Sequence, residues 1–190
     1  MARENQRYEQ EFIATAKVKT GKDVPEWMAV VKSSGLDKMN AIVKWLKETH
    51  KLNHSQAAFI AGIYLNGGQP VYDYERLFAN LFAGKDALLP TYRILEDRLK
   101  SAVPEADCVP TKTYISIEGK RCFACATMTS KNIRVGLDLG DKPFDSYVQK
   151  AKSLGAMPNL THMIEVSQAG DVNDELLGYV RQAYDRVHNK

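Results

Sequence analysis

The chain has 190 residues, of which 44% are hydrophobic and 26% are charged, and its formal net charge is +3. These proportions are close to globular averages, so they exclude a disordered chain and predict a buried core. The excess of basic residues lies in residues 1–70, yet it is too small to require a nucleic-acid or anionic-membrane partner. The length fits one ordinary domain or two small ones.

Neither a signal peptide nor a membrane span is predicted. The first residues, M-A-R-E-N-Q-R-Y-E-Q, hold no apolar stretch of the kind that a secretory signal contains. No apolar run approaches the roughly 18–20 residues that a membrane span needs. Three cysteines, an odd number, suit a reducing compartment. We therefore expect a cytoplasmic protein with no membrane partner.

Residues 1–68 predict a bundle of four short helices, because their apolar residues recur at helical spacing. The expected helices cover residues 4–19, the segment from the cap at Asp23 to Gly35, the segment from Asp37 to the turn at residues 50–53, and the segment from His54 to the glycines at 67–68. The last two resemble a helix-turn-helix. Residues 55–65, however, contain one Gln and no basic residue that could contact base edges, so nucleic acid is not the expected partner.

The stretch N-G-G-Q-P at residues 66–70 predicts a domain boundary after residue 68. In residues 69–190, helices are expected over 72–83 and 86–102. Strands are expected over 112–118, 121–128 and 133–139, followed by a helix over 144–153, a strand over 161–167 and a helix over 171–187. The order α-α-β-β-β-α-β-α predicts an α+β domain, with an antiparallel four-stranded sheet and helices packed mainly on one face.

Two parts of the chain resemble known bacterial domain families. The stretch T-G-K-D-V-P-E-W-M-A-V-V-K-S-S-G-L, followed by I-V-K-W-L-K-E-T-H-K-L-N-H, is similar to the helical domain of unknown function numbered 4287. The segments K-T-Y-I-S-I, V-G-L-D-L, T-H-M-I-E-V and A-Y-D resemble the domain of unknown function numbered 5655. The resemblance covers about residues 21–184. It implies a helical domain followed by an α+β domain, and it assigns no catalytic residue.

One face of the predicted sheet is the main candidate for a binding site. Helices are expected to cover the face lined by Ile133, Val135, Leu137 and Leu139. Mixed aromatic, charged and hydroxyl side chains on the other face suit a groove for a small molecule or a peptide, although a plain solvated face would carry the same residues. The candidate binding residues are Tyr114, Ser116, Glu118, Arg134, Asp138 and Glu165.

Other chemistry has weaker support in the sequence. His50 and His54 are separated by a turn, and no phosphate-binding glycine loop is present, so we expect no metal and no cofactor. A thiol site pairing Cys125 with His162 is an alternative. The motif R-C-F-A-C at residues 121–125 lies in a predicted strand, where side chains alternate. Cys122 and Cys125 are then expected to point to opposite faces, with Cys125 on the side of Phe123.

The sequence therefore favours a non-catalytic ligand- or partner-binding module. The partner would be a small molecule, a protein or a peptide, and a homodimer stays open. The first alternative is a thiol or acid–base hydrolase with its site between the domains. The second is nucleic-acid binding through the basic helical domain.

Overall fold

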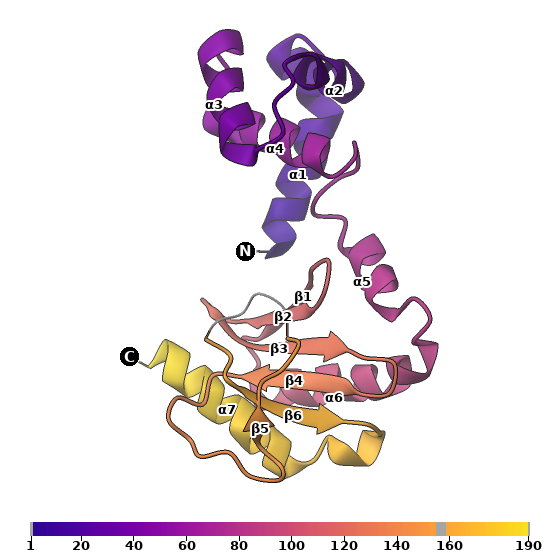
Figure 1. Cartoon of the computed structure of the whole chain (residues 1–190), viewed down its shortest axis with the longest axis vertical. Helices are drawn as coiled ribbons and strands as arrows, with labels where there is room; N and C mark the ends of the chain where they lie inside the picture. The colour runs from indigo at the N-terminus through magenta and orange to yellow at the C-terminus, as the bar shows by residue number, and fades with distance from the viewer. Residues whose placement is uncertain (1, 155–158, 190) are drawn as a thin grey trace. The chain divides into compact units, whose positions relative to one another are not determined.

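A computed structural model of the chain describes residues 2–154 and 159–189. It divides the chain into two compact units, residues 1–73 and 74–190 (Figure 1). Residues 71 and 72 are attached to the first unit, because the buried carboxylate of Glu9 accepts the backbone N–H groups of Val71 at 2.9 Å and Tyr72 at 2.8 Å. The sequence predicts the domain boundary after residue 68, whereas the contacts within the structure divide the chain after Asp73.

The first unit consists of helices. They are α1 (Ala2–Thr20), α2 (Val24–Ser33), α3 (Met39–His50) and α4 (His54–Leu65). The carboxylate of Asp23 accepts the N–H of Glu26 at 2.9 Å, and Glu26 accepts the N–H of Asp23 at 2.7 Å, so α2 begins with a capping box. The core of the unit gathers Phe12, Ala16, Trp27, Val31, Ile42, Leu46, Ala57 and Ile60.

The second unit combines three α-helices with one sheet. The helices are α5 (Tyr74–Phe82), α6 (Leu89–Ala102) and α7 (Asp174–His188), with short 3-10 turns at Asp86–Leu88 and Ala169–Asp171. The strands are β1 (Asp107–Pro110), β2 (Ile115–Glu118), β3 (Cys122–Met128), β4 (Ile133–Leu137), β5 (Gln149–Lys150) and β6 (His162–Val166). The chain is thus α+β, as predicted, but the sheet has six strands rather than four.

All strand pairs are antiparallel, in the order β1-β2-β3-β4-β6-β5. The predicted meander of three strands corresponds to β2, β3 and β4. The two strands that the sequence pattern misses, β1 and β5, are the edge strands.

The helix predicted over residues 144–153 is wrong. Residues 144–148 form a loop, and Gln149–Lys150 form β5. The side chain of Asp145 accepts the N–H groups of Tyr147 at 2.7 Å and Val148 at 2.6 Å, which folds the segment into a turn instead of a helix. Val148 of this segment is fully buried.

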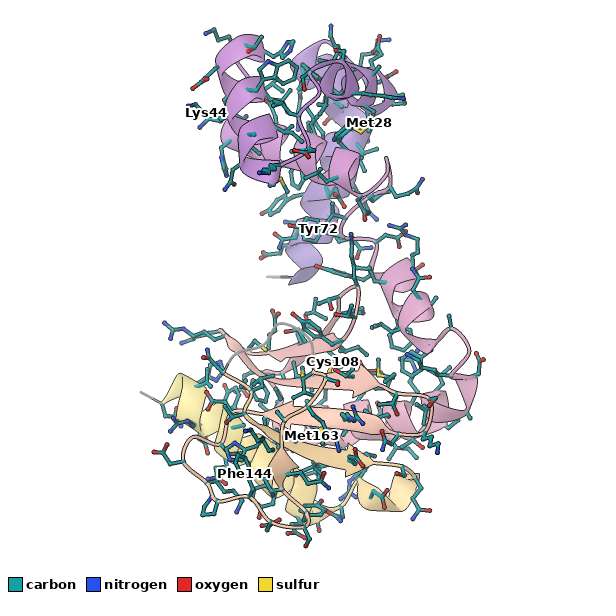
Figure 2. The ribbon with its side chains drawn as sticks, in the orientation of Figure 1. Met28, Lys44, Tyr72, Cys108, Phe144 and Met163 are labelled. Carbon is teal, nitrogen blue, oxygen red and sulfur yellow. The ribbon has the colours of Figure 1, made fainter. Side chains whose placement is uncertain are left out.

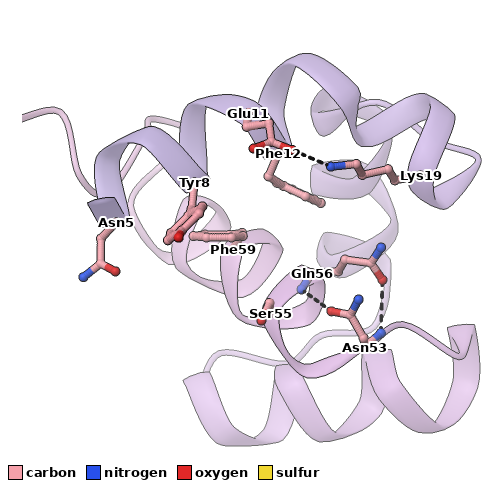
Figure 3. Close-up of a pocket in the computed structure, with 9 residues that line it drawn as sticks. All are labelled: Asn5, Tyr8, Glu11, Phe12, Lys19, Asn53, Ser55, Gln56 and Phe59. Carbon is pink, nitrogen blue, oxygen red and sulfur yellow. Dashed lines mark hydrogen bonds and ion pairs between the residues drawn. The ribbon is translucent and has the colours of Figure 1, made fainter. Parts of the chain in front are cut away.

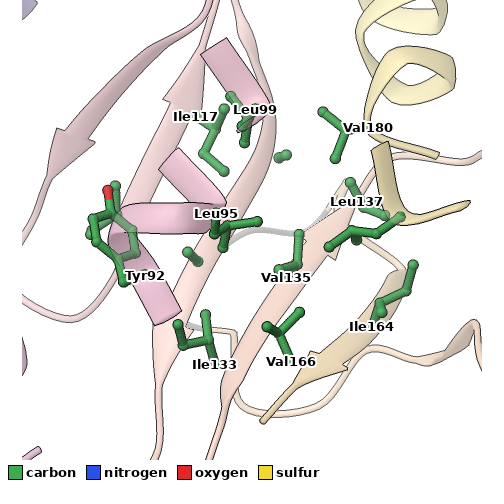
Figure 4. Close-up of a cluster of buried hydrophobic side chains, with 14 of the residues drawn as sticks. Tyr92, Leu95, Leu99, Ile117, Ile133, Val135, Leu137, Ile164, Val166 and Val180 are labelled. Carbon is green, nitrogen blue, oxygen red and sulfur yellow. The ribbon is translucent and has the colours of Figure 1, made fainter. Parts of the chain in front are cut away.

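The helices cover one face of the sheet (Figure 4). Side chains of α6 and α7 pack against the face that carries Val135 and Leu137, which confirms the predicted orientation of β4. The residues labelled around this core include Tyr92, Leu95, Leu99, Ile117, Ile133, Val135, Leu137, Ile164, Val166 and Val180.

The middle of the opposite face is covered too. Leu154 and Leu160, from the segment between β5 and β6, pack against Cys125 of β3 and Met163 of β6, the last of which is labelled in Figure 2. These contacts cover the centre of the face on which the sequence places the candidate binding groove.

Candidate functional site

A β-bulge places both cysteines of the R-C-F-A-C motif on the same face of the sheet. Ser116 is the Cα partner of Cys125, and Glu118 is the partner of Cys122, so one extra residue stands in β3. Ser116 and Glu118 point to one face because they are two residues apart. The prediction that the two thiols point to opposite faces is therefore wrong.

Phe123 is on the other side of the sheet from Cys125. Its ring meets the ring of Tyr184 of α7 edge to face, with centroids 5.3 Å apart. Cys125 packs instead with Leu154 and Met163. The prediction that Cys125 shares the side of Phe123 is therefore wrong, because the bulge interrupts the alternation that the prediction assumes.

Neither thiol is prepared for nucleophilic chemistry. Burial raises the pKa of Cys125 to about 12. Burial also raises the pKa of Cys122, against the opposing effect of a hydrogen bond with Ser116. A thiol nucleophile needs a lowered pKa.

The structure does not bring Cys125 and His162 together. His162 is the partner of Leu137, on the face that the helices cover, whereas Cys125 is the partner of Gly136 on the other face. Both ring nitrogens of His162 have partners, with Thr161 Oγ1 at 2.9 Å and the carbonyl oxygen of Lys142 at 2.8 Å. This histidine is 1% exposed and is used for packing.

The six candidate binding residues are mostly engaged with other protein groups. The hydroxyl of Ser116 donates to Glu118 at 2.8 Å, and Arg134 Nε donates to Glu165 at 3.3 Å. Tyr114 packs beside the cluster of Cys125, Leu154, Leu160 and Met163, and burial raises its pKa. The sixth, Asp138, lies at the end of β4, where it lines a cavity.

This cavity, which we call the end pocket, has a volume of about 570 Å³. It lies where the turn between β2 and β3, the residue after β4 and the end of α7 meet. The sequence pattern misses it because its residues come from separate segments of the chain. Its lining residues are Lys120, Arg121, Cys122, Asp138, Asn159, Arg186, Val187 and His188.

Arg186 is fixed at the wall of the end pocket. Its Nε donates to Asp138 at 3.0 Å, and its guanidinium lies against the backbone of Gly140. A Cβ at Gly140 would stand 2.5 Å from the Cζ of Arg186, and Gly140 has a φ of +64°, so only glycine suits this position. The ion pair with Asp138 occupies the Nε of this guanidinium.

His188 attaches the turn between β2 and β3 to the end of α7. Its Nε2 accepts the backbone N–H of Arg121 at 3.2 Å, and its Nδ1 is 2.9 Å from the carbonyl oxygen of Tyr184. A neutral ring with its hydrogen on Nδ1 satisfies both contacts. The ring also stacks on Tyr184, with centroids 4.2 Å apart. The hydrogen bond from Arg121 to His188 holds the turn that carries Lys120 and Arg121 beside the pocket.

The charge of the end pocket is positive. Three cationic side chains, those of Lys120, Arg121 and Arg186, line it together with one carboxylate, that of Asp138. Asp138 forms an ion pair with Arg186, so its negative charge does not neutralise Lys120 or Arg121. Such an arrangement can hold a carboxylate or phosphate group through charge-assisted hydrogen bonds.

Neither a metal-binding cluster nor a membrane-spanning helix is found among the residues that the structure describes. Within residues 2–154 and 159–189, no group of three or more His, Cys, Asp or Glu side chains is arranged to hold a metal ion. No helix in the same part of the chain has the length and apolar character needed to cross a membrane.

The fold defines an α+β protein with an N-terminal helical unit. Residues 78–187, more than half of the chain, match the family model described as a domain of unknown function (DUF5655), and the chain belongs to that family. Residues 9–66 match the model described as a domain of unknown function (DUF4287). The resemblance found in the sequence is thus confirmed in identity and in order. Neither the curated proteins nor the solved structures include a match.

Proposed function

We propose that the α+β unit is a non-catalytic binding domain that holds a small anionic molecule in the end pocket. The observation that carries this proposal is the set of three cations, against one carboxylate, around a cavity of about 570 Å³. A volume of this order accommodates a small metabolite. A cytoplasmic location, which three free cysteines favour, stays a prediction.

Lys120 and Arg121 are the groups expected to contact the ligand first. Both are exposed, and within the part of the chain that the structure describes neither side chain forms an ion pair. The backbone N–H of Arg121 is occupied by His188, so the turn is held while the guanidinium stays available. A ligand oxygen between these two cations and Arg186 would gain from all three.

The sheet face opposite α6 and α7 is a weaker place for the ligand. Its charged residues pair with each other, as Arg134 does with Glu165, and its centre is occupied by Leu154 and Leu160. Removing partners from such pairs would cost free energy that a ligand has to replace. Lys120 and Arg121 of the end pocket avoid this cost, because neither side chain forms an ion pair within the described residues.

The two alternatives gain no support from the geometry. The thiol form of the hydrolase alternative needs Cys125 and His162 together, and they lie on opposite faces. The helix-turn-helix form of the nucleic-acid alternative needs an exposed α4, but Ala57, Ile60, Ala61, Gly62 and Ile63 of this helix are buried in the first unit. Binding of a small anion therefore remains the function that we propose.

The test is an NMR titration of the isotope-labelled full chain with inorganic phosphate and, separately, with acetate. We expect saturable shifts of the backbone amides of Arg121, Cys122 and Gly140, and an affinity that falls as salt is added. Replacing Arg121 by Ala should weaken binding about tenfold, which corresponds to the loss of one charge-assisted hydrogen bond.

Lys131→Ala is the matched control, because Lys131 is an exposed cation in the turn at the other end of β3 and β4. It should leave the affinity unchanged. The proposal is wrong if neither anion shifts these amides, or if Lys131→Ala weakens binding as much as Arg121→Ala.

A further inference from the structure

The first unit has a groove of its own, which we call the α1–α4 groove (Figure 3). Its volume is about 450 Å³, and residues of α1 form one side while the start of α4 forms the other. It belongs wholly to residues 1–73 and shares no residue with the end pocket. The lining residues are Asn5, Tyr8, Glu11, Phe12, Lys19, Asn53, Ser55, Gln56 and Phe59.

Aromatic rings from both helices line the groove, Tyr8 and Phe12 from α1 and Phe59 from α4. Phe12 and Phe59 are stacked, with centroids 5.5 Å apart and ring planes at 25°. Tyr8 lies beside Phe59 in Figure 3, and 48% of its surface is exposed. The guanidinium of Arg7 lies over the ring of Tyr8, 5.1 Å from its centroid. Flat apolar surfaces of this kind favour a planar ring.

Two amide side chains at the start of α4 also line the groove, and each is fixed by a hydrogen bond. Asn53 Oδ1 accepts the N–H of Gln56 at 2.9 Å, and Gln56 Oε1 accepts the N–H of Asn53 at 3.1 Å. Both carbonyl oxygens are therefore in use. The NH₂ groups of both side chains have no hydrogen-bond partner among residues 2–154 and 159–189. The pair thus offers two unpaired NH₂ groups as donors, while each carbonyl oxygen already accepts one backbone N–H.

The capping box of α2 is an internal comparison for this pair. It has the same reciprocal geometry, but Asp23 and Glu26 occupy the two positions. Carboxylates at a helix N-terminus also interact favourably with the helix dipole. Helix capping alone therefore does not require amides at the start of α4. What the amides of Asn53 and Gln56 add is a pair of NH₂ donors at the groove.

We infer that the α1–α4 groove binds a planar aromatic molecule that carries a carboxylate or carbonyl oxygen. The ring lies against Tyr8 and Phe59, and the oxygen accepts hydrogen bonds from Asn53 Nδ2 and Gln56 Nε2. A ring that carries only an amine leaves these two NH₂ donors without an acceptor. The site is independent of the proposed anion site in the α+β unit.

The experiment follows the side-chain NH₂ resonances of Asn53 and Gln56 in the isotope-labelled full chain while benzoate is added. We expect saturable shifts with benzoate. Cyclohexanecarboxylate has the same charge but is not planar, and aniline is planar but is a donor. Both should bind at least tenfold more weakly than benzoate. Equal binding of either comparison compound would contradict the inference.

Gln56→Glu is the informative variant. Glu26 shows that a glutamate can complete the capping box, so this change keeps the helix cap while it removes the NH₂ donor. Benzoate affinity should fall at least tenfold, and the thermal unfolding midpoint should stay nearly unchanged. Glu26→Gln at α2 is the matched control, and it should leave benzoate binding unaltered.

A second variant separates this site from the end pocket. With Arg121→Ala, benzoate should still shift the NH₂ resonances of Asn53 and Gln56 at the same affinity. Three results would overturn the inference. They are the absence of any NH₂ shift with benzoate, full binding by Gln56→Glu, and loss of the shift in Arg121→Ala.

Discussion

Leu154 lies directly over Gly136 of β4, so closely that a Cβ at Gly136 would stand 2.5 Å from Cδ1 of Leu154. The same Cβ would stand 2.9 Å from Sγ of Cys125. The segment after β5 therefore approaches the sheet at a residue that has no side chain. This close approach buries Cys125. Leu154 and Leu160 together form an apolar cover over the centre of this face.

Gly136→Ala should destabilise the α+β unit. The added methyl group has to displace Leu154 or Cys125, and overpacking of this kind costs about 1–3 kcal/mol of the free energy of unfolding. Urea unfolding of the full chain measures the change. Gly178→Ala is the control, since Gly178 lies in α7 with nothing within 4 Å of an added Cβ. It should raise the free energy of unfolding by about 0.5–1 kcal/mol. Equal effects of the two changes would contradict the packing of Leu154.

Cys122 should be the first cysteine to react with a maleimide in the folded chain. It is half-buried and lines the end pocket, whereas Cys125 is 0% exposed and burial raises the pKa of the half-buried Cys108 to about 12. Since burial raises the pKa of Cys122, its reaction at neutral pH should be slower than that of a free thiol and should accelerate at alkaline pH. Mass spectrometry after brief alkylation gives the order of labelling. Cys122→Ser should abolish the first labelling event, and early labelling of Cys125 would contradict the cover by Leu154.

Stability should fall at alkaline pH because two thiols are kept protonated by burial. The pKa values of Cys108 and Cys125 are raised from 9.0 to about 12. The folded chain keeps these protons while the unfolded chain releases them, so stability is lost as the pH rises above 9.0. At about pH 10 each thiol should cost about 1.4 kcal/mol.

Urea unfolding with a reducing agent, at about pH 7 and about pH 10, measures this loss. The free energy of unfolding of Cys125→Ala should fall by about 1.4 kcal/mol less than that of the unaltered chain. The comparison of the two chains removes the contributions of other titrating groups. An equal fall in both chains would show that the thiol of Cys125 is not held protonated.

Local rules predict the helices and the central strands well. Asp23 and Glu26 at α2 have the spacing of a capping box, and the structure contains that box. The apolar alternation of Ile133, Val135 and Leu137 correctly identifies the face of β4 that the helices cover. Such features depend on residues that are near one another in the chain. They can therefore be inferred without knowing what packs against them.

Features that depend on distant contacts are not predicted. The two edge strands are short, and β5 has only the residues Gln149 and Lys150, which pair with β6. No glycine or proline in the sequence marks the bulge beside Cys122. Strict alternation of side chains along β3 therefore assigns one thiol to the wrong face of the sheet. The end pocket joins Arg121, Asp138 and Arg186 from three separate segments. Of the predicted binding residues, Asp138 alone lines it, and the role of the other five stays a prediction.

Glu9 should hold Val71 and Tyr72, which follow the helices of the first unit, in a fixed conformation. Its carboxylate is 1% exposed and accepts the N–H groups of Val71 and Tyr72 at 2.9 and 2.8 Å. Glu9→Ala removes both acceptors, and hydrogen bonds to a charged group contribute about 1.5–3 kcal/mol each. Amide hydrogen exchange at Val71 and Tyr72 should accelerate at least tenfold, while exchange in α7 stays unchanged. Glu9→Gln keeps one acceptor oxygen, so its effect should be intermediate. If exchange at Val71 and Tyr72 is unaffected by Glu9→Ala, the carboxylate does not hold this segment against α1.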